Sequence, residues 1–287
     1  MSEIINENLN PKELRKIAEE AVLCVGDYLR EVFRSNVEFE QKRDQHDLVT
    51  LHDKECERRI IALIKKYNPS GLIIGEESGT LEGDSKITWY IDPIDGTSNF
   101  VQGLAFFCAV VGVAVDDKMV AGAVYDPMAD NLFSADDEKA YLNGEILKTK
   151  DALPPKVATL ITGYPTALDI ETDGKELALE IFHEFAMEFS SVRRTGSGAL
   201  SLCHVAAGWT DSAFGSYVSP WDISAPMQIV RMAGGTYLPF DYDDKDINDQ
   251  YTAGYIAFGP KGNYPVLEVV AEKIIKSRGG KGRIFKN

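Results

Sequence analysis

The stretch WYIDPIDGTSNF, residues 89–100, places two aspartates at the end of a β-like run and follows them at once with a turn. Asp92 and Asp95 stand three residues apart on either side of a proline, and Gly96 comes next. Proline and glycine restrict the backbone so that both carboxylates can point into one space. A strand that ends in two carboxylates and then turns sharply predicts a binding site at that turn.

Further carboxylates end apolar runs or begin helical segments elsewhere in the chain. Glu76 follows the run GLIIG, while Asp222 and Asp53 each stand at the start of a helical pattern. If these groups converge, two carboxylates ~4 Å apart repel by roughly 1 kcal/mol in water and about 4 kcal/mol at an effective dielectric near 20, so the cluster needs a cation. Every ligand is a hard oxygen, and no histidine or cysteine spacing accompanies them, which favours Mg²⁺, Mn²⁺ or Ca²⁺ over zinc.

The composition limits the partners of this 287-residue chain. A formal net charge of −15 makes nucleic acid and a membrane surface poor partners. The acidic N-terminus is no signal peptide, and no apolar run is long enough to span a bilayer, so we expect a cytoplasmic protein. The one basic stretch is predicted to be a solvated last helix and tail, with Lys273, Lys276, Arg278, Lys281, Arg283 and Lys286.

Hydrophobic periodicity predicts the order of helices and strands. Apolar residues at three- and four-residue steps indicate one amphipathic helix over residues 14–32, and a second helix ends at Asn68. Short strands over residues 105–115, 119–125 and 131–134 are expected to be antiparallel neighbours.

The segment LPPK is the best candidate for a boundary, because strand and helix patterns alternate beyond it as in layered α/β folds. We expect an N-terminal α+β half, residues 1–153, whose antiparallel sheet carries most of the metal ligands. The C-terminal α/β half, residues 154–287, would carry Asp222 and the residues on the substrate side.

The motifs GEES, DPIDGTSNF and WDISAP, in this order and spacing, resemble the inositol monophosphatase family of Mg²⁺-dependent phosphatases. That family shares a superfamily with fructose-1,6-bisphosphatases, and the resemblance covers nearly the whole chain. It implies an α/β fold built as a five-layer αβαβα sandwich, a homodimer and inhibition by lithium.

The resemblance also assigns metal ligands to positions of this sequence. Glu76, Asp92 and the backbone carbonyl of Ile94 would hold one ion. Asp92, Asp95 and Asp222 would hold a second, and a looser third site would again use Glu76. The implied cofactor is Mg²⁺, with two or three ions in each active site and Mn²⁺ as a substitute.

The catalytic residues implied by the same resemblance are Glu76, Thr97 and Asp53. Thr97 would help to orient the attacking water, and Asp53 would help to activate that water or to order Thr97. The implied substrate-binding residues are Gly96 and Thr97, through backbone N–H groups that bind phosphate oxygens, and Ser197 and Gly198 on the leaving-group side.

Together these features predict a Mg²⁺-dependent hydrolase that acts on the phosphate monoester of a small polyol or sugar, of the inositol-1-phosphate type. An activated water would attack phosphorus without a covalent intermediate. One position argues against a preference for inositol. Inositol-selective members carry an acidic residue seven places before the aspartate of WD, and here that place is Gly215. Ser216 and Tyr217 offer hydroxyl groups instead.

Three alternatives remain open from the sequence. The same scaffold could act on fructose-1,6-bisphosphate, histidinol phosphate or the 3′-phosphate of a nucleotide. A haloacid-dehalogenase-type phosphatase also carries DGT, but its two aspartates stand two residues apart, whereas Asp92 and Asp95 are three apart. A regulatory protein that keeps the fold without the chemistry is disfavoured, because no ligand is missing.

Overall fold

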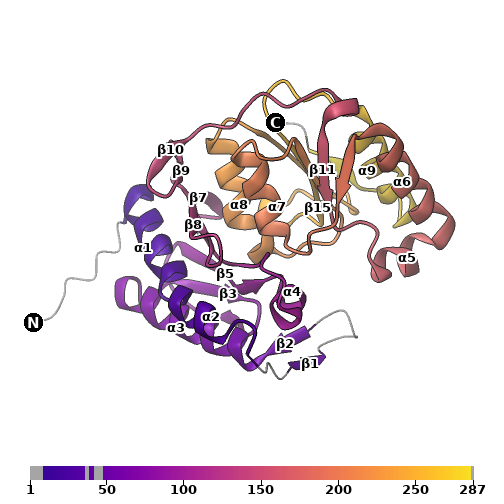
Figure 1. Ribbon diagram of the computed structural model, residues 1–287. Coiled ribbons are helices and arrows are strands. Elements are labelled where there is room, and N and C mark those ends of the chain that lie inside the picture. The colour runs from indigo at the N-terminus through magenta and orange to yellow at the C-terminus, as the bar shows by residue number, and fades with distance from the viewer. Residues whose placement is uncertain (1–8, 36–38, 42–47, 286–287) are drawn as a thin grey trace, which may run out of the picture.

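The computed structural model describes residues 9–35, 39–41 and 48–285 of the chain. These residues form five alternating layers of helices and sheets, which confirms the expected αβαβα sandwich (Figure 1). Each sheet has helices on both faces, so its strands are shielded from water on both sides. The outer layer beside the first sheet contains α1 (Pro11–Leu23) and α3 (Leu51–Tyr67), the middle layer α7 (Gly198–Ala206) and α8 (Pro220–Met232), and the far layer α5 (Ala167–Asp173), α6 (Lys175–Glu188) and α9 (Pro265–Ser277).

Within the described residues, the first sheet has eight strands in the order β10-β9-β8-β7-β6-β5-β3-β4. β6, β7 and β8 are antiparallel neighbours, as predicted, whereas β3 pairs with β5 in parallel. The parallel pair brings the ends of β3 and β5, and the carboxylates that follow, to the same edge. The strands are β3 (Leu72–Gly75), β4 (Gly79–Leu81), β5 (Ile87–Asp95), β6 (Cys108–Val115), β7 (Lys118–Asp126), β8 (Asn131–Ala135), β9 (Ala140–Leu142) and β10 (Glu145–Leu147).

The second sheet, in the part of the chain that is described, has six strands in the order β12-β11-β13-β15-β14-β16. β12, β11 and β13 are parallel, and the remaining strands are antiparallel to their neighbours. The strands are β11 (Thr159–Thr162), β12 (Ser191–Arg193), β13 (Ser212–Gly215), β14 (Thr236–Asp241), β15 (Gly254–Phe258) and β16 (Arg283–Ile284). β1 (Phe39–Gln41) and β2 (Leu48–Thr50) pair antiparallel in a separate two-stranded sheet.

The single helix predicted over residues 14–32 is wrong, because the structure divides it into α1 and α2 (Gly26–Val32). The chain turns between them where Gly26 lies against β7. A Cβ added at Gly26 would lie 2.6 Å from Cε1 of Tyr125, so only glycine fits under that ring. This contact is between residues far apart in the sequence, and hydrophobic periodicity cannot reveal it.

The middle helices, α7 and α8, pack against both sheets and so connect the first sheet to the second. α8 contacts β5, β6, β7 and β8 of the first sheet and β14 of the second. Glycines permit the close approach, since a Cβ at Gly112 of β6 would lie 2.1 Å from Oγ of Ser224 in α8. This packing carries Asp222, in the first turn of α8, to the first sheet.

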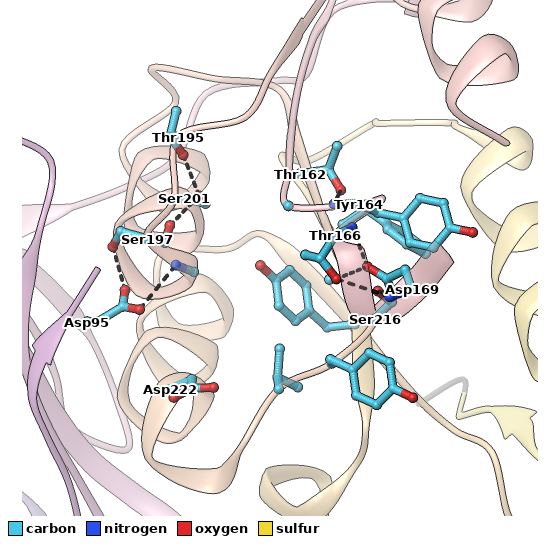
Figure 2. Close-up of a pocket in the computed structure, with 18 residues that line it drawn as sticks. Asp95, Thr162, Tyr164, Thr166, Asp169, Thr195, Ser197, Ser201, Ser216 and Asp222 are labelled. Carbon is cyan, nitrogen blue, oxygen red and sulfur yellow. Dashed lines mark hydrogen bonds between the residues drawn. The ribbon is translucent and has the colours of Figure 1, made fainter. Parts of the chain in front are cut away.

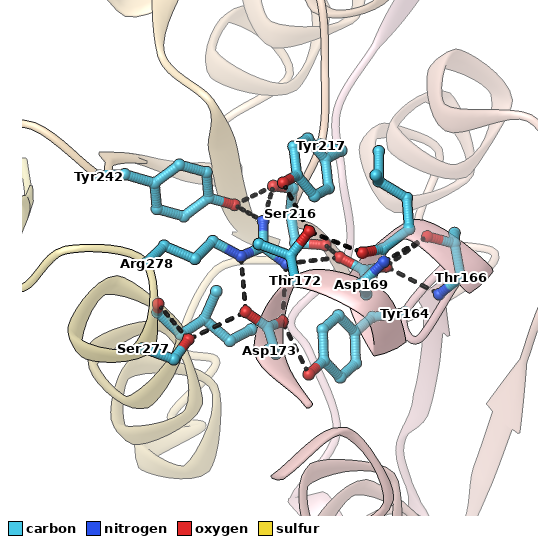
Figure 3. Close-up of polar contacts among 12 residues, drawn as sticks. Tyr164, Thr166, Asp169, Thr172, Asp173, Ser216, Tyr217, Tyr242, Ser277 and Arg278 are labelled. Atoms are coloured by element: carbon cyan, nitrogen blue, oxygen red, sulfur yellow. Dashed lines mark hydrogen bonds and ion pairs between the residues drawn. The ribbon is translucent and has the colours of Figure 1, made fainter. Parts of the chain in front are cut away.

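The prediction of a wholly solvated C-terminal segment is wrong for Arg278 (Figure 3). Its side chain is 3 % exposed and pairs with Asp169 and Asp173 of α5, with N–O distances of 2.7 Å to each. Lys281 and Arg283 are exposed, as predicted. Lys286 lies outside the described residues. The end of α9 therefore anchors α5 to the second sheet rather than facing solvent.

Candidate active site

An irregularity at the end of β5 brings Asp92 and Asp95 to the same side. The pairing of β5 with β6 shifts register between these two residues. Inside the bulge, the amide of Ile94 donates to Oδ1 of Asp92 over 3.0 Å. Gly96 then adopts a φ of 96°, a left-handed conformation that favours glycine, and α4 (Thr97–Gln102) begins. The bulge and the left-handed turn at Gly96 therefore shape the end of β5 that carries both carboxylates.

Glu76 reaches this site because β3 and β5 run in parallel. Gly75 lies opposite Ile91, and the amide of Glu76 donates to the carbonyl of Ile91 over 3.1 Å. This pairing places the charge of Glu76 where it acts on Asp92. Burial raises the pKa of Asp92 well above its usual value, and the charges of Glu76, Asp95 and Asp222 raise it further. The four carboxylates predicted to be ligands thus act on one another electrostatically.

Asp95, at the end of β5, faces the first turn of α7 in the middle layer (Figure 2). The hydroxyl of Ser197 donates to Oδ2 of Asp95, and the amide of Ala199 donates to the same oxygen over 2.8 Å. The amide of Gly198 lies 3.4 Å from Oδ1. Burial raises the pKa of Asp95, while these three hydrogen bonds lower it. A helix N-terminus therefore compensates the charge of this buried carboxylate.

Asp222 is held by its own helix. It stands three residues after the N-cap Ser219, whose amide donates to Oδ2 of Asp222 over 2.8 Å. This reciprocal capping arrangement fixes the side chain in the first turn of α8.

Asp53 and Thr97 meet beside the carboxylate cluster. Asp53 is buried in the first turn of α3, where it accepts hydrogen bonds from the amide and hydroxyl of Thr50 over 2.8 and 2.6 Å. The hydroxyl of Thr97 lies 3.1 Å from Oδ1 of Asp53 and 3.0 Å from the carbonyl oxygen of Ile94. Burial raises the pKa of Asp53 to about 6, and the charge of Glu76 adds to the shift. Asp53 is thus placed to orient Thr97.

Sequence reasoning missed Glu57, which supports the loop that carries Glu76. Glu57 is 3 % exposed, and its Oε1 accepts from the amide of Glu77 over 3.0 Å. It stands four residues after Asp53, on the same face of α3. That helical spacing between two acidic residues on an inward face is the signal that could have identified it.

A cavity of 210 Å³ lies between the carboxylates and the second sheet (Figure 2). Asp95 and Asp222 line one side of it. The predicted substrate-side residues Ser197 and Gly198, and the hydroxyl-bearing Ser216 and Tyr217, also line it. Gly215 lies in the wall as well, where a Cβ would come within 2.5 Å of Cε1 of Tyr255.

The donor set fits a hard divalent cation. It consists of carboxylates and a backbone carbonyl, which are the oxygen ligands that such cations prefer. Burial first, and then the charges of neighbouring carboxylates, raise the pKa values of Asp92 and Asp95. Among the described residues, no group of three or more acidic, histidine or cysteine side chains stands in an arrangement that could hold a metal ion as it is. Oxygens of Asp92, Asp95 and Asp222 instead accept from amide groups.

Comparisons with known proteins show similarity to one family along most of the chain. The model of the inositol monophosphatase family matches residues 10–276. A protein of Aquifex aeolicus named fructose-1,6-bisphosphatase/inositol-1-monophosphatase is 35% identical over 244 residues, covering 82% of this chain and 90% of that protein. Nus factor SuhB of Escherichia coli (strain K12) is 41% identical over 207 residues, covering 71% of this chain and 76% of that protein.

A solved structure shows the same fold. The extragenic suppressor protein suhB of Bartonella henselae superposes with a TM-score of 0.78 at 27% identity, covering 92% of this chain and 98% of that one. The family model and the solved structure thus agree in both sequence and fold. The chain belongs to the inositol monophosphatase family.

Proposed function

We propose that the protein hydrolyses the phosphate monoester of a small polyol or sugar, with Mg²⁺ as cofactor and water as the nucleophile. Membership of the inositol monophosphatase family supports phosphatase activity. The observation that supports the proposal is the electrostatic interaction of Asp92 with Glu76, Asp95 and Asp222, together with the cavity that Asp95 and Asp222 line. These four side chains and the carbonyl of Ile94 would hold the ions.

Divalent ions at this site would neutralise the ester, acidify water and stabilise the leaving alkoxide. The protein's own residues would arrange the reactants around them. Asp53, which is ionised above a pH of about 6, would orient the hydroxyl of Thr97 toward the attacking water. The backbone N–H groups of Gly96 and Thr97 would bind phosphate oxygens. The leaving alcohol would occupy the cavity beside Ser197 and Gly198.

Inositol-1-phosphate is the first substrate that we propose, and fructose-1,6-bisphosphate, histidinol phosphate and a nucleotide 3′-phosphate are the alternatives. The double name of the Aquifex aeolicus relative favours testing inositol and fructose esters side by side. Phosphate release from the four esters should be measured with Mg²⁺, with Mn²⁺ and with a chelator. We expect metal-dependent turnover of one or more of them. Absence of turnover on every ester at saturating metal would refute the proposed function.

Three finer properties belong to the same proposal. Lithium should inhibit by occupying a Mg²⁺ position, which a titration against Mg²⁺ concentration would reveal as competition. Sedimentation should show a homodimer. The cytoplasmic location stays a prediction for fractionation to test. Within the described residues, no helix has both the length and the apolar character needed to cross a membrane.

A further inference from the structure

Tyr255 forms part of the cavity wall close to the carboxylate cluster. It belongs to β15, where it lies opposite Gly215 of β13 in the antiparallel pairing. The residue is only 3 % exposed, yet it lines the cavity together with Asp95 and Asp222. A buried tyrosine at this place contributes a rigid ring and one polar atom to the wall.

The ring of Tyr255 is fixed from two sides. On one side is the backbone of Gly215, where a Cβ would lie 2.5 Å from Cε1 and 2.9 Å from Cζ of the ring. The second contact is a stack with Tyr237, with ring centroids 5.6 Å apart and an interplanar angle of 23°. The ring therefore occupies the space into which any side chain at position 215 would project. Its hydroxyl is held in place by packing and not by a polar partner.

Among the described residues, no hydrogen bond engages the hydroxyl of Tyr255. Other polar groups of the cavity are already engaged. The carboxylate of Asp169, for example, accepts from Ser216, from Arg278 and from both the amide and the hydroxyl of Thr166. Burial raises the pKa of Tyr255, and the charges of Asp95 and Asp222 raise it further. The phenol thus stays protonated and is a hydrogen-bond donor.

We propose that the hydroxyl of Tyr255 donates a hydrogen bond to a hydroxyl group of the leaving alcohol next to the scissile ester, and that it thereby selects phosphates of polyols. This inference rests on the proposed function of the same site. An alcohol without a neighbouring hydroxyl leaves the phenol unpaired and loses this contribution. Tyr255 is accordingly a residue that determines specificity.

The test compares Tyr255→Phe with the wild-type protein on two esters, inositol-1-phosphate and phenyl phosphate, whose leaving group has no second hydroxyl. Tyr255→Phe keeps the ring and removes only the hydroxyl. We expect kcat/KM for inositol-1-phosphate to fall about tenfold, the loss of one neutral hydrogen bond, and kcat/KM for phenyl phosphate to stay the same. Tyr237→Phe is the matched control, because it removes a neighbouring buried hydroxyl that has no partner in the described chain and does not line the cavity.

A second variant displaces the hydroxyl of Tyr255 without removing it. Gly215→Ala keeps the phenol but forces the ring of Tyr255 to shift, so it should reduce turnover of inositol-1-phosphate more than that of phenyl phosphate. Equal losses on both esters, or no loss on either, in the Tyr255→Phe variant would overturn the inference while wild-type turnover leaves the proposed function standing. If the wild-type protein hydrolyses another of the four proposed esters instead of inositol-1-phosphate, that ester replaces it in the comparison. If it hydrolyses none of the four, the proposed function fails and this inference fails with it.

Discussion

At the scale of single residues, the charge of Asp95 is compensated by a helix N-terminus and opposed by neighbouring carboxylates. We expect Asp95→Asn to abolish phosphate release, because the amide is a poor ligand for a hard cation. The variant should fold, since an amide oxygen can still accept from α7. Without metal its melting temperature should equal or exceed that of the wild type, because one repulsive charge is gone. Circular dichroism melts with a chelator, together with an activity assay, check both parts, and an unchanged kcat would contradict the metal role.

Asp53 gives the site a pH dependence whose direction follows from its raised pKa. In the folded protein the pKa is about 6, against an ordinary value of 3.8, so the folded state holds this proton more tightly than the unfolded state. The stabilisation is complete below the unfolded value and is lost as pH rises through about 6. One pKa unit corresponds to about 1.4 kcal/mol, so Asp53 contributes about 3 kcal/mol over this range. Metal-free protein should therefore unfold more easily at pH 7 than at pH 5.

Catalysis should follow the opposite trend. Below a pH of about 6, Asp53 is protonated. Burial also raises the pKa values of Asp92 and Asp95, so protons compete with metal for these carboxylates as the pH falls. Phosphate release at saturating Mg²⁺ should fall as pH drops through this range. A pH–rate profile that stays level below 6 would show that these carboxylates do not need to be ionised.

At the scale of elements, the first turn of α7 links the two halves of the chain through Asp95. Ser197→Ala removes one of the three hydrogen-bond donors to Asp95. It also removes the N-cap hydrogen bond that the hydroxyl of Ser197 accepts from the amide of Leu200. Loss of such a supporting partner typically weakens metal binding 10- to 100-fold, so activity should require correspondingly more Mg²⁺. Asn10→Ala is the matched control, because Asn10 caps α1 far from the site. It should cost about 1 kcal/mol of stability and leave the Mg²⁺ requirement unchanged.

The sequence was sufficient to predict elements with a clear hydrophobic period and carboxylates that stand at the end of a strand. The strands β6, β7 and β8 are of this kind. The charges of Glu76, Asp95 and Asp222 act on Asp92, while their role as metal ligands stays a prediction. The sequence was insufficient where a distant contact decides the outcome. The break before Gly26 depends on Tyr125, and the role inferred for Tyr255 depends on an unpaired hydroxyl in a strand whose apolar pattern indicates only core. The burial of Arg278 likewise depends on two aspartates more than a hundred residues away.

At the scale of the whole molecule, Arg278 ties the last helix to α5 and to the chain after β13 (Figure 3). Arg278→Met would leave the buried carboxylates of Asp169 and Asp173 without their cation. Breaking a buried pair typically costs about 3–5 kcal/mol. Lys273→Met is the matched control on the same helix, because Lys273 pairs with the more exposed Glu180 and Glu184 and should cost less than about 1 kcal/mol. Denaturant midpoints measure both variants, and equal shifts would contradict the structural role of Arg278.

The middle layer, with α7 and α8, belongs to the C-terminal half by sequence but packs against both sheets. Recombination of two relatives at residue 153, in evolution or by engineering, would combine the first sheet of one protein with α7 and α8 of the other. The helices that cover one face of the first sheet, and Asp222, would then come from a different parent. Chimeras between relatives should lose solubility at this crossover unless the contacting faces are inherited together. Changing the substrate by shuffling halves is therefore a poor strategy, and point changes in the cavity wall are the better route to a new specificity.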